Sequence, residues 1–172
     1  KEFNLKFPLE KFRGKYYLIA CDGSEFNIAR NLKDADTFHE PNGKSVSGFN
    51  MVHTISLYEV CSKRYLDLEV QPERLKNEFQ AICNLMDRYA YGGFPIFIAD
   101  RGFSSYNVFA HAIENNVDFL IRAKDLNVQR FLGVGTLPDK LDTTIELILT
   151  RIQSKKKHKH PEKESQYRYI CK

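Results

Sequence analysis

The sequence predicts an α/β fold in which a mixed sheet is built in the order β-β-β-α-β-α-β. Three observations support this prediction. Short apolar runs that end at turn residues are typical of buried strands, two stretches rich in β-branched and aromatic residues favour a hairpin, and two stretches carry apolar residues at helical spacing. Strands and helices alternate in the second half, which predicts parallel strands joined by right-handed crossovers.

The first predicted strand covers residues 16–21, an apolar run that ends at Asp22-Gly23-Ser24. Because Asp, Gly and Ser together signal a turn, we expect this strand to be buried and to place Asp22 at its carboxyl end. The polar segment 25–44 is predicted to be a loop with one helical turn at most.

A hairpin is predicted for residues 47–58 and 63–70, because both stretches are rich in β-branched and aromatic residues. A helix then fits a start at Pro72 and an end at Gly92, since Pro is favoured in the first turn and Gly ends the pattern. The apolar positions that recur between them are Leu75, Phe79, Ile82, Leu85 or Met86, and Tyr89.

The second half repeats the alternation of strand and helix. Residues 94–99 are a second apolar run and predict a buried strand. Ser104 or Ser105 can cap the next helix, and the asparagines at 115–116 end it. The apolar stripe of this helix is Val108, Phe109, Ala112 and Ile113. After the helix, residues 117–123 predict a third buried strand.

The last part of the chain differs in character from the rest. Residues 143–152 and 166–171 predict two strands joined by a basic loop, with no helix after them. We interpret residues 125–172 as the beginning of a separate β-rich element, inside which the chain ends.

The net charge of +4 comes from this tail, because the chain from residue 151 onward carries eight Lys or Arg residues and two Glu residues. Lys155, Lys156 and Lys157 form the centre of the basic cluster. Such a cluster can contact nucleic-acid phosphates, but it can equally be a solvated loop.

Composition excludes several classes of protein. Hydrophobic residues make up 42% and charged residues 28%, as in ordinary globular proteins, and no apolar stretch approaches the roughly 20 residues that span a bilayer. No signal peptide is visible. The four cysteines lack the close pairing of a zinc site, so we expect reduced thiols and a cytoplasmic protein.

Asp22 and Asp100 are the candidate catalytic and metal-binding residues. Each follows an apolar run and precedes a glycine within two positions. Sites in open α/β sheets form beyond the carboxyl ends of strands, so the two carboxylates converge if their strands are parallel neighbours. Hard oxygen ligands suit Mg²⁺ or Mn²⁺, and two such ions can activate the attacking oxygen and stabilise the leaving oxygen of a phosphodiester. For either aspartate alone, a turn residue is the simpler interpretation.

Three motifs resemble those of insertion-sequence transposases of the DDE type, whose catalytic domain is ribonuclease H-like. They are the strand ending in Asp22-Gly-Ser, the strand ending in Asp100-Arg-Gly-Phe, and the segment Asn116-Val-Asp-Phe-Leu-Ile-Arg-Ala-Lys124. The resemblance covers residues 14–124, and the remainder is similar to the start of a β-rich insertion found in one branch of the family.

The resemblance implies a ribonuclease H-like core in residues 1–124, an incomplete insertion in 125–172, and Asp22 and Asp100 as ligands of two Mg²⁺ or Mn²⁺ ions. It further implies cleavage and joining of transposon-end and target DNA, oligomers of the full-length protein on DNA, and a nucleoid-associated, bacterial-type location. The family's third carboxylate, a helical Glu after the insertion, has no counterpart here, so we expect the chain alone to be inactive. The alternatives are another ribonuclease H-like nuclease and a non-catalytic nucleic-acid-binding relative.

Several further residues carry narrower predictions. Arg101 can contact DNA or pair with a nearby carboxylate, and Arg122 and Lys124 are either phosphate contacts or ordinary exposed residues. Gly102 is interpreted as a position that a side chain would crowd. His53, inside an apolar strand, is predicted to be a core residue and not a ligand.

Overall fold

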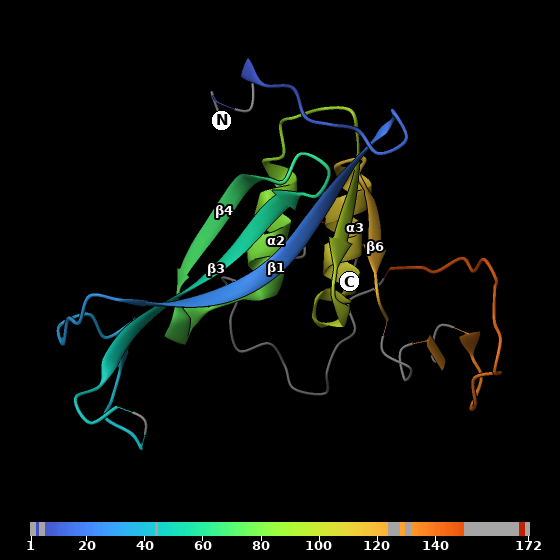
Figure 1. The fold of residues 1–172 in the computed structure, drawn as a ribbon. Helices are drawn as coiled ribbons and strands as arrows, with labels where there is room; N and C mark the ends of the chain where they lie inside the picture. Colours follow the sequence, from blue (N-terminus) through green and yellow to red (C-terminus); the bar gives the residue numbers. More distant parts are fainter. Residues whose placement is uncertain are drawn as a thin grey trace.

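The computed structural model describes residues 3, 6–43, 45–123, 128–129, 132–149 and 169–170. Within them, one mixed sheet is covered on one face by two helices (Figure 1). The strand order is β2-β3-β1-β5-β6, and β4 also pairs with β3. The strands are β1 (Tyr16–Ile28), β2 (Phe38–His39), β3 (Phe49–Glu59), β4 (Arg64–Pro72), β5 (Phe94–Ala99) and β6 (Asp118–Ile121).

Strand directions agree with the mixed sheet that the sequence predicts. β1 and β4 each run antiparallel to β3, while β5 lies parallel to β1 and β6 lies parallel to β5. The predicted hairpin between β3 and β4 is confirmed, and so is the order β-β-β-α-β-α-β. The two-residue strand β2, which pairs with the start of β3, was not predicted.

Both helices pack on the same side of the sheet and on each other (Figure 1). The second helix begins after Ser105 and ends before Asn115, as predicted. Among the described residues no helix covers the opposite side, which we call the open face, and Leu68, Val70 and Leu120 are exposed there. None of the described helices is long and apolar enough to cross a membrane. The helical elements are η1 (Glu73–Leu75), α2 (Glu78–Asp87), η2 (Arg101–Phe103) and α3 (Tyr106–Glu114).

β1 is longer than the sequence predicts, so the expected turn at Asp22 is wrong. The strand continues because β3 pairs with it as far as Ile28↔Asn50, whereas its pairing with β5 ends at Cys21↔Ala99. A local turn signal gives way here to hydrogen bonds from a long partner strand. β1 and β3 therefore continue as a pair past the point where the pairing of β1 with β5 ends (Figure 1).

The predicted helix start at Pro72 is also wrong. Pro72 is the last residue of β4, and Leu75, an expected core position, lies in η1 with 62% of its surface exposed. The helix instead begins after Asn77, whose side chain accepts a hydrogen bond from the Gln80 backbone N–H at 3.2 Å. Gln71 of β4 accepts a hydrogen bond from the Asn77 backbone N–H at 2.8 Å, which fixes this cap against the sheet.

The predicted tail strands receive little support. Residues 141–149, which include the described part of the strand expected at 143–152, contain no strand. Most of the strand expected at 166–171 lies outside the described residues. Of the two described residues there, Tyr169 contacts the His111 ring of α3 edge-on, at 4.8 Å between ring centroids, and neither is in a strand.

A β-bulge in β4 turns two acidic side chains towards α2. The register with β3 changes from Tyr58↔Tyr65 to Leu57↔Asp67, which leaves one extra residue in β4. Because residues directly opposite in a pair share a face, Asp67 and Glu69 lie on the same face as the buried Leu57. The bulge therefore places two carboxylates between β4 and the helix.

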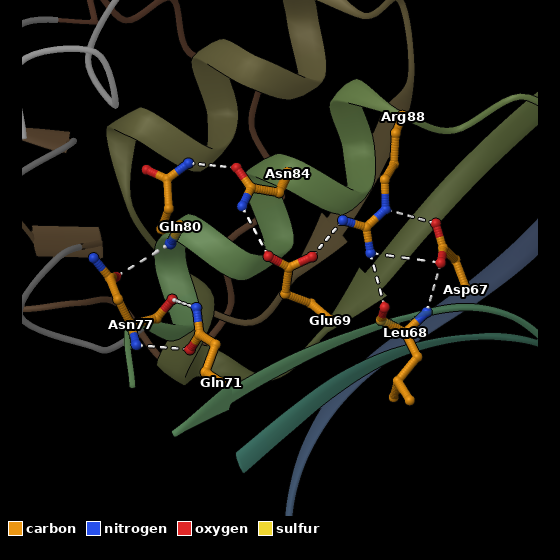
Figure 2. Close-up of polar contacts among 8 residues, drawn as sticks. All are labelled: Asp67, Leu68, Glu69, Gln71, Asn77, Gln80, Asn84 and Arg88. Carbon is orange, nitrogen blue, oxygen red and sulfur yellow. Dashed lines mark hydrogen bonds and ion pairs between the residues drawn. The ribbon is translucent and has the colours of Figure 1, made fainter. Parts of the chain in front are cut away.

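Arg88, just after α2, neutralises these carboxylates (Figure 2). Its Nε lies 2.7 Å from Oδ2 of Asp67, its Nη1 pairs with Oε2 of Glu69, and its Nη2 donates to the Leu68 carbonyl at 2.8 Å. Asn84 of α2 donates to the other oxygen of Glu69 at 3.0 Å. This network joins the carboxyl-terminal half of α2 to β4.

An ion pair fastens the extension of β1 to the segment before α2. The Lys76 ammonium lies 2.5 Å from Oε1 of Glu25 and 3.0 Å from Oε1 of Glu73. The hydrogen bond and charge of Lys76 lower the pKa of Glu25 below its usual 4.5 and raise the pKa of Lys76. Because the folded pKa of Glu25 is depressed, its stabilising effect is present above pH 4.5 and is lost as the pH falls through the folded pKa.

The Lys76→Met variant is expected to return the Glu25 pKa to about 4.5, because both the hydrogen bond and the positive charge are removed. NMR titration of the Glu25 side-chain carboxyl measures this change. The exposed Lys33, changed to Met, is the control and should leave the Glu25 titration unaltered. An unchanged midpoint in Lys76→Met would show that the ion pair does not form in solution.

Candidate active site

The parallel strands β1, β5 and β6 end their pairing in one row. The last register pairs are Cys21↔Ala99 between β1 and β5, and Ala99↔Ile121 between β5 and β6. The next residues along the three strands are Asp22, Asp100 and Arg122. The expectation that the first and fourth predicted strands are parallel neighbours is therefore confirmed, and it brings these residues to the same edge of the sheet.

Asp22 lies on the open face at the point where β1 and β5 part. It is exposed, whereas Cys21, whose side chain points to the other face, is 4% exposed. Oδ1 of Asp22 accepts a hydrogen bond from the Gly23 backbone N–H at 2.8 Å. Burial, with the adjacent Asp22 charge, raises the pKa of the Cys21 thiol far above its usual range, so this cysteine is a protonated core residue and not a nucleophile.

Gly23 follows Asp22 for a packing reason and not to form a turn. A Cβ atom at Gly23 would come within 3.0 Å of Cε1 and 3.2 Å of Nε2 of His53. The His53 ring is only 3% exposed, which confirms that it belongs to the core, and its Nε2 lies 3.2 Å from Oε1 of Glu78. The absence of a side chain at Gly23 thus lets the His53 ring pack directly beneath the strand that carries Asp22.

Asp100 is held by the turn that follows β5. Its Oδ1 accepts a hydrogen bond from the Gly102 backbone N–H at 2.8 Å, which caps η2. Phe103, at the end of η2, is 4% exposed and anchors the turn in the core. A Cβ at Gly102 would lie only 2.8 Å from the same Oδ1, which confirms the prediction that a side chain would crowd this position.

The Gly102→Ala variant is expected to displace the Asp100 carboxylate while leaving the fold intact, because the clash is with the end of a flexible side chain. Turning a carboxylate away by one rotamer costs on the order of 1 kcal/mol, so Mn²⁺ binding at this edge should weaken about fivefold. Isothermal titration with Mn²⁺ measures the change, and the melting temperature reports the fold. Gly43→Ala, where a Cβ meets nothing within 4 Å, is the matched control. Unchanged Mn²⁺ affinity in Gly102→Ala would indicate that Asp100 is not a ligand of the metal.

The two carboxylates suit a hard cation. Both are exposed at one sheet edge, and among the described residues no Lys, Arg or His side chain forms an ion pair with either. Arg101 is exposed and has no ion pair within that part of the chain, so its predicted pairing with a carboxylate is not seen. No group of three His, Cys, Asp or Glu residues that could hold a metal occurs among the described residues.

The other sequence candidates divide into two groups. Arg122 is exposed and directly follows β6, next in the row to Asp100. Lys124 and the tail lysines Lys155, Lys156 and Lys157 lie outside the described residues.

The family described as Transposase DDE domain matches residues 13–170. This chain is a member of the DDE transposase family. The mixed sheet, with β1 between β3 and β5, agrees with the ribonuclease H-like fold of these transposases. Members of the family act in DNA transposition, bind DNA and use divalent metal ions. Comparison with curated proteins and with solved structures found no match.

Proposed function

We propose that Asp22 and Asp100 are two of the metal-binding carboxylates of a transposase that cleaves transposon-end DNA and joins the new 3′-hydroxyl to target DNA. The register of β1, β5 and β6 carries this proposal, because it brings both aspartates to one edge on neighbouring parallel strands. Two carboxylates at one edge repel each other unless a cation lies between them.

In this mechanism, Asp22 and Asp100 would hold Mg²⁺ or Mn²⁺. Two bound ions would supply Lewis-acid activation of the attacking oxygen and stabilise the leaving oxygen of the phosphodiester. The Gly23 and Gly102 backbone N–H groups each occupy one carboxylate oxygen and so orient the ligands. Arg122, which directly follows β6 in the same row, would contact a DNA phosphate near the cleaved bond, and the register of β6 supports this role.

We propose further that the third metal ligand comes from outside the described residues, since these bring together no group of three ligand-type side chains. Residues 1–124 would be the catalytic core and residues 125–172 the start of the β-rich insertion. Arg101, Lys124, Lys155, Lys156 and Lys157 remain proposed DNA contacts. We expect no DNA cleavage by the 172-residue chain, because the described residues contribute only Asp22 and Asp100 to a site that needs a third ligand.

A cleavage assay with the purified chain and Mn²⁺ tests this proposal, together with paramagnetic NMR broadening by Mn²⁺. The expected result is broadening centred on residues 22–23 and 99–102, without strand cleavage. Cleavage that is lost in Asp22→Ala would show that the chain already contains a complete site. Broadening elsewhere only, at millimolar Mn²⁺, would exclude this metal site and favour a non-catalytic DNA-binding role. For a protein that also carries the third ligand, hydrolysis without strand joining would indicate a nuclease.

A further inference from the structure

A tight turn at residues 11–15 directly precedes β1, which begins six residues before Asp22 in the middle of that strand. The Phe12 backbone N–H donates to the Tyr16 carbonyl at 2.8 Å, and the Lys15 N–H donates to the Phe12 carbonyl at 3.1 Å. Arg13 and Gly14 adopt positive φ angles of 50° and 69°. These bonds give the turn a defined shape, so its side chains project from fixed positions.

The segment before this turn is fastened to the β3–β4 hairpin. Arg64 donates to the Phe7 and Pro8 carbonyls, at 2.8 Å in each case. The Glu10 backbone N–H donates to the Ser62 hydroxyl at 2.6 Å. The segment that leads into the turn is therefore hydrogen-bonded to the sheet.

Cations and aromatic rings alternate in this turn. The Lys15 ammonium lies 4.8 Å from the centre of the Tyr16 ring and 5.1 Å from that of Phe94, which is paired with Tyr16 at the start of β5. Arg13 lies 5.4 Å from the centre of the Phe12 ring. Phe94 and Phe12 remain 58% and 41% exposed. We call Lys11, Phe12, Arg13, Lys15, Tyr16 and Phe94 the basic–aromatic patch.

The three cations of this patch have no acidic partner. Lys11, Arg13 and Lys15 are exposed and form no ion pair among the described residues, in contrast to Lys76 and Arg88. The excess of positive charge in this segment contrasts with the charge of the residues that follow it. Residues 1–17 carry five Lys or Arg and two Glu, whereas residues 18–150 carry thirteen Lys or Arg and eighteen Asp or Glu. Residues 1–17 therefore carry a net charge of +3 and residues 18–150 a net charge of −5, and the unpaired cations of the turn complement a polyanion.

We propose that the basic–aromatic patch binds single-stranded DNA. Phosphates lie against Lys11, Arg13 and Lys15, and an unpaired base stacks on the exposed ring of Phe94. This pairing of backbone-neutralising cations with exposed rings is the chemistry of single-strand binding surfaces. In a duplex the base faces are covered by neighbouring bases, so duplex DNA could use the cations but not the ring. The proposal rests on the proposed function for its DNA partner, but it needs neither metal nor cleavage.

The patch is separate from the candidate metal site. Tyr16 and Phe94 form the first register pair of β1 and β5, six residues before Asp22 and Asp100. At about 3.3 Å per strand residue the separation is roughly 20 Å. A DNA strand bound to the patch therefore lies several nucleotides away from any phosphodiester bound at the carboxylates. The bound segment would be unpaired DNA that flanks the cleavage site.

Fluorescence anisotropy with a labelled thymidine oligonucleotide and a duplex of equal length, in EDTA, tests the proposal. The protein is the 172-residue chain in which Lys155, Lys156 and Lys157 are changed to Gln, to reduce binding by the tail. Adding Lys11→Gln and Lys15→Gln should weaken single-strand binding roughly tenfold at low salt and reduce the salt slope by about 1.4, since each contact contributes about 0.7. The control pair is Lys33→Gln with Lys140→Gln, two exposed lysines elsewhere.

Phe94→Leu should weaken single-strand binding about tenfold and leave duplex binding unchanged, because only an unpaired base can stack on the ring. Equal effects of the two lysine pairs would overturn the proposal, and so would unchanged single-strand affinity in Phe94→Leu. Circular dichroism confirms that each variant is folded. Because EDTA removes metal, these outcomes do not depend on whether Asp22 and Asp100 bind metal.

Discussion

Asp22→Asn and Asp100→Asn are each expected to weaken Mn²⁺ binding about 10- to 100-fold. Each change removes one negative charge from a site with two carboxylates and leaves a neutral oxygen ligand of similar shape. Because both aspartates are exposed, the effective dielectric is close to that of water, and a unit charge about 4 Å from a divalent ion is then worth about 2 kcal/mol. Isothermal titration, or the electron paramagnetic resonance signal of free Mn²⁺, measures the affinity.

In a transposase with a complete metal site, the same changes should reduce strand cleavage by at least about 10²- to 10³-fold, because two bound ions would act on both the attacking and the leaving oxygen. Asp118→Asn is the matched control. Asp118 is an exposed aspartate at the amino end of β6, away from the row formed by Asp22 and Asp100. Normal Mn²⁺ affinity in both Asp22→Asn and Asp100→Asn would disprove the assignment of these residues as metal ligands. A loss of affinity no larger than that in Asp118→Asn would show that only the net charge of the protein matters.

The position of the two aspartates could be predicted because it depends on local patterns. Apolar runs identify β1 and β5 as buried strands, and the intervening helix makes them parallel, so their ends meet at one edge. The same local reading failed at Gly23. Its neighbours signal a turn, but the structure pairs Gly23 with Ile55 and packs it on His53, both about 30 residues away.

The basic–aromatic patch shows a different limit. The alternation of cations and rings at residues 11–17 is visible in the sequence, yet Phe94 is contributed by β5. Only the register Tyr16↔Phe94 brings that ring beneath Lys15. A surface patch built from two paired strands can therefore be recognised only when the pairing of the strands is known. Likewise, the β4 bulge that directs Asp67 and Glu69 towards α2 cannot be read from a regular alternation.

Arg88→Met is expected to lower the free energy of unfolding by about 2–3 kcal/mol, the largest stability change predicted for this domain. Methionine replaces the aliphatic part of the arginine side chain, but Asp67 and Glu69 then lie side by side on one face of β4 without a cation, with side chains only 24% and 20% exposed. The Arg88 side chain is 36% exposed, so the loss should be smaller than for a fully buried pair. Urea unfolding at neutral pH, monitored by circular dichroism, measures the change.

A triple variant, Arg88→Met with Asp67→Asn and Glu69→Gln, separates the two possible origins of that loss. If the cost comes from unpaired carboxylates, neutralising both should recover most of the stability, to within about 1 kcal/mol of the natural chain. If the cost comes from lost contacts of the guanidinium, including its hydrogen bond to the Leu68 carbonyl, the triple variant should be no more stable than Arg88→Met. The bulge favours the first outcome, because it commits two acidic residues to the helix-facing side of β4 and makes a cation at the end of α2 a requirement of the fold.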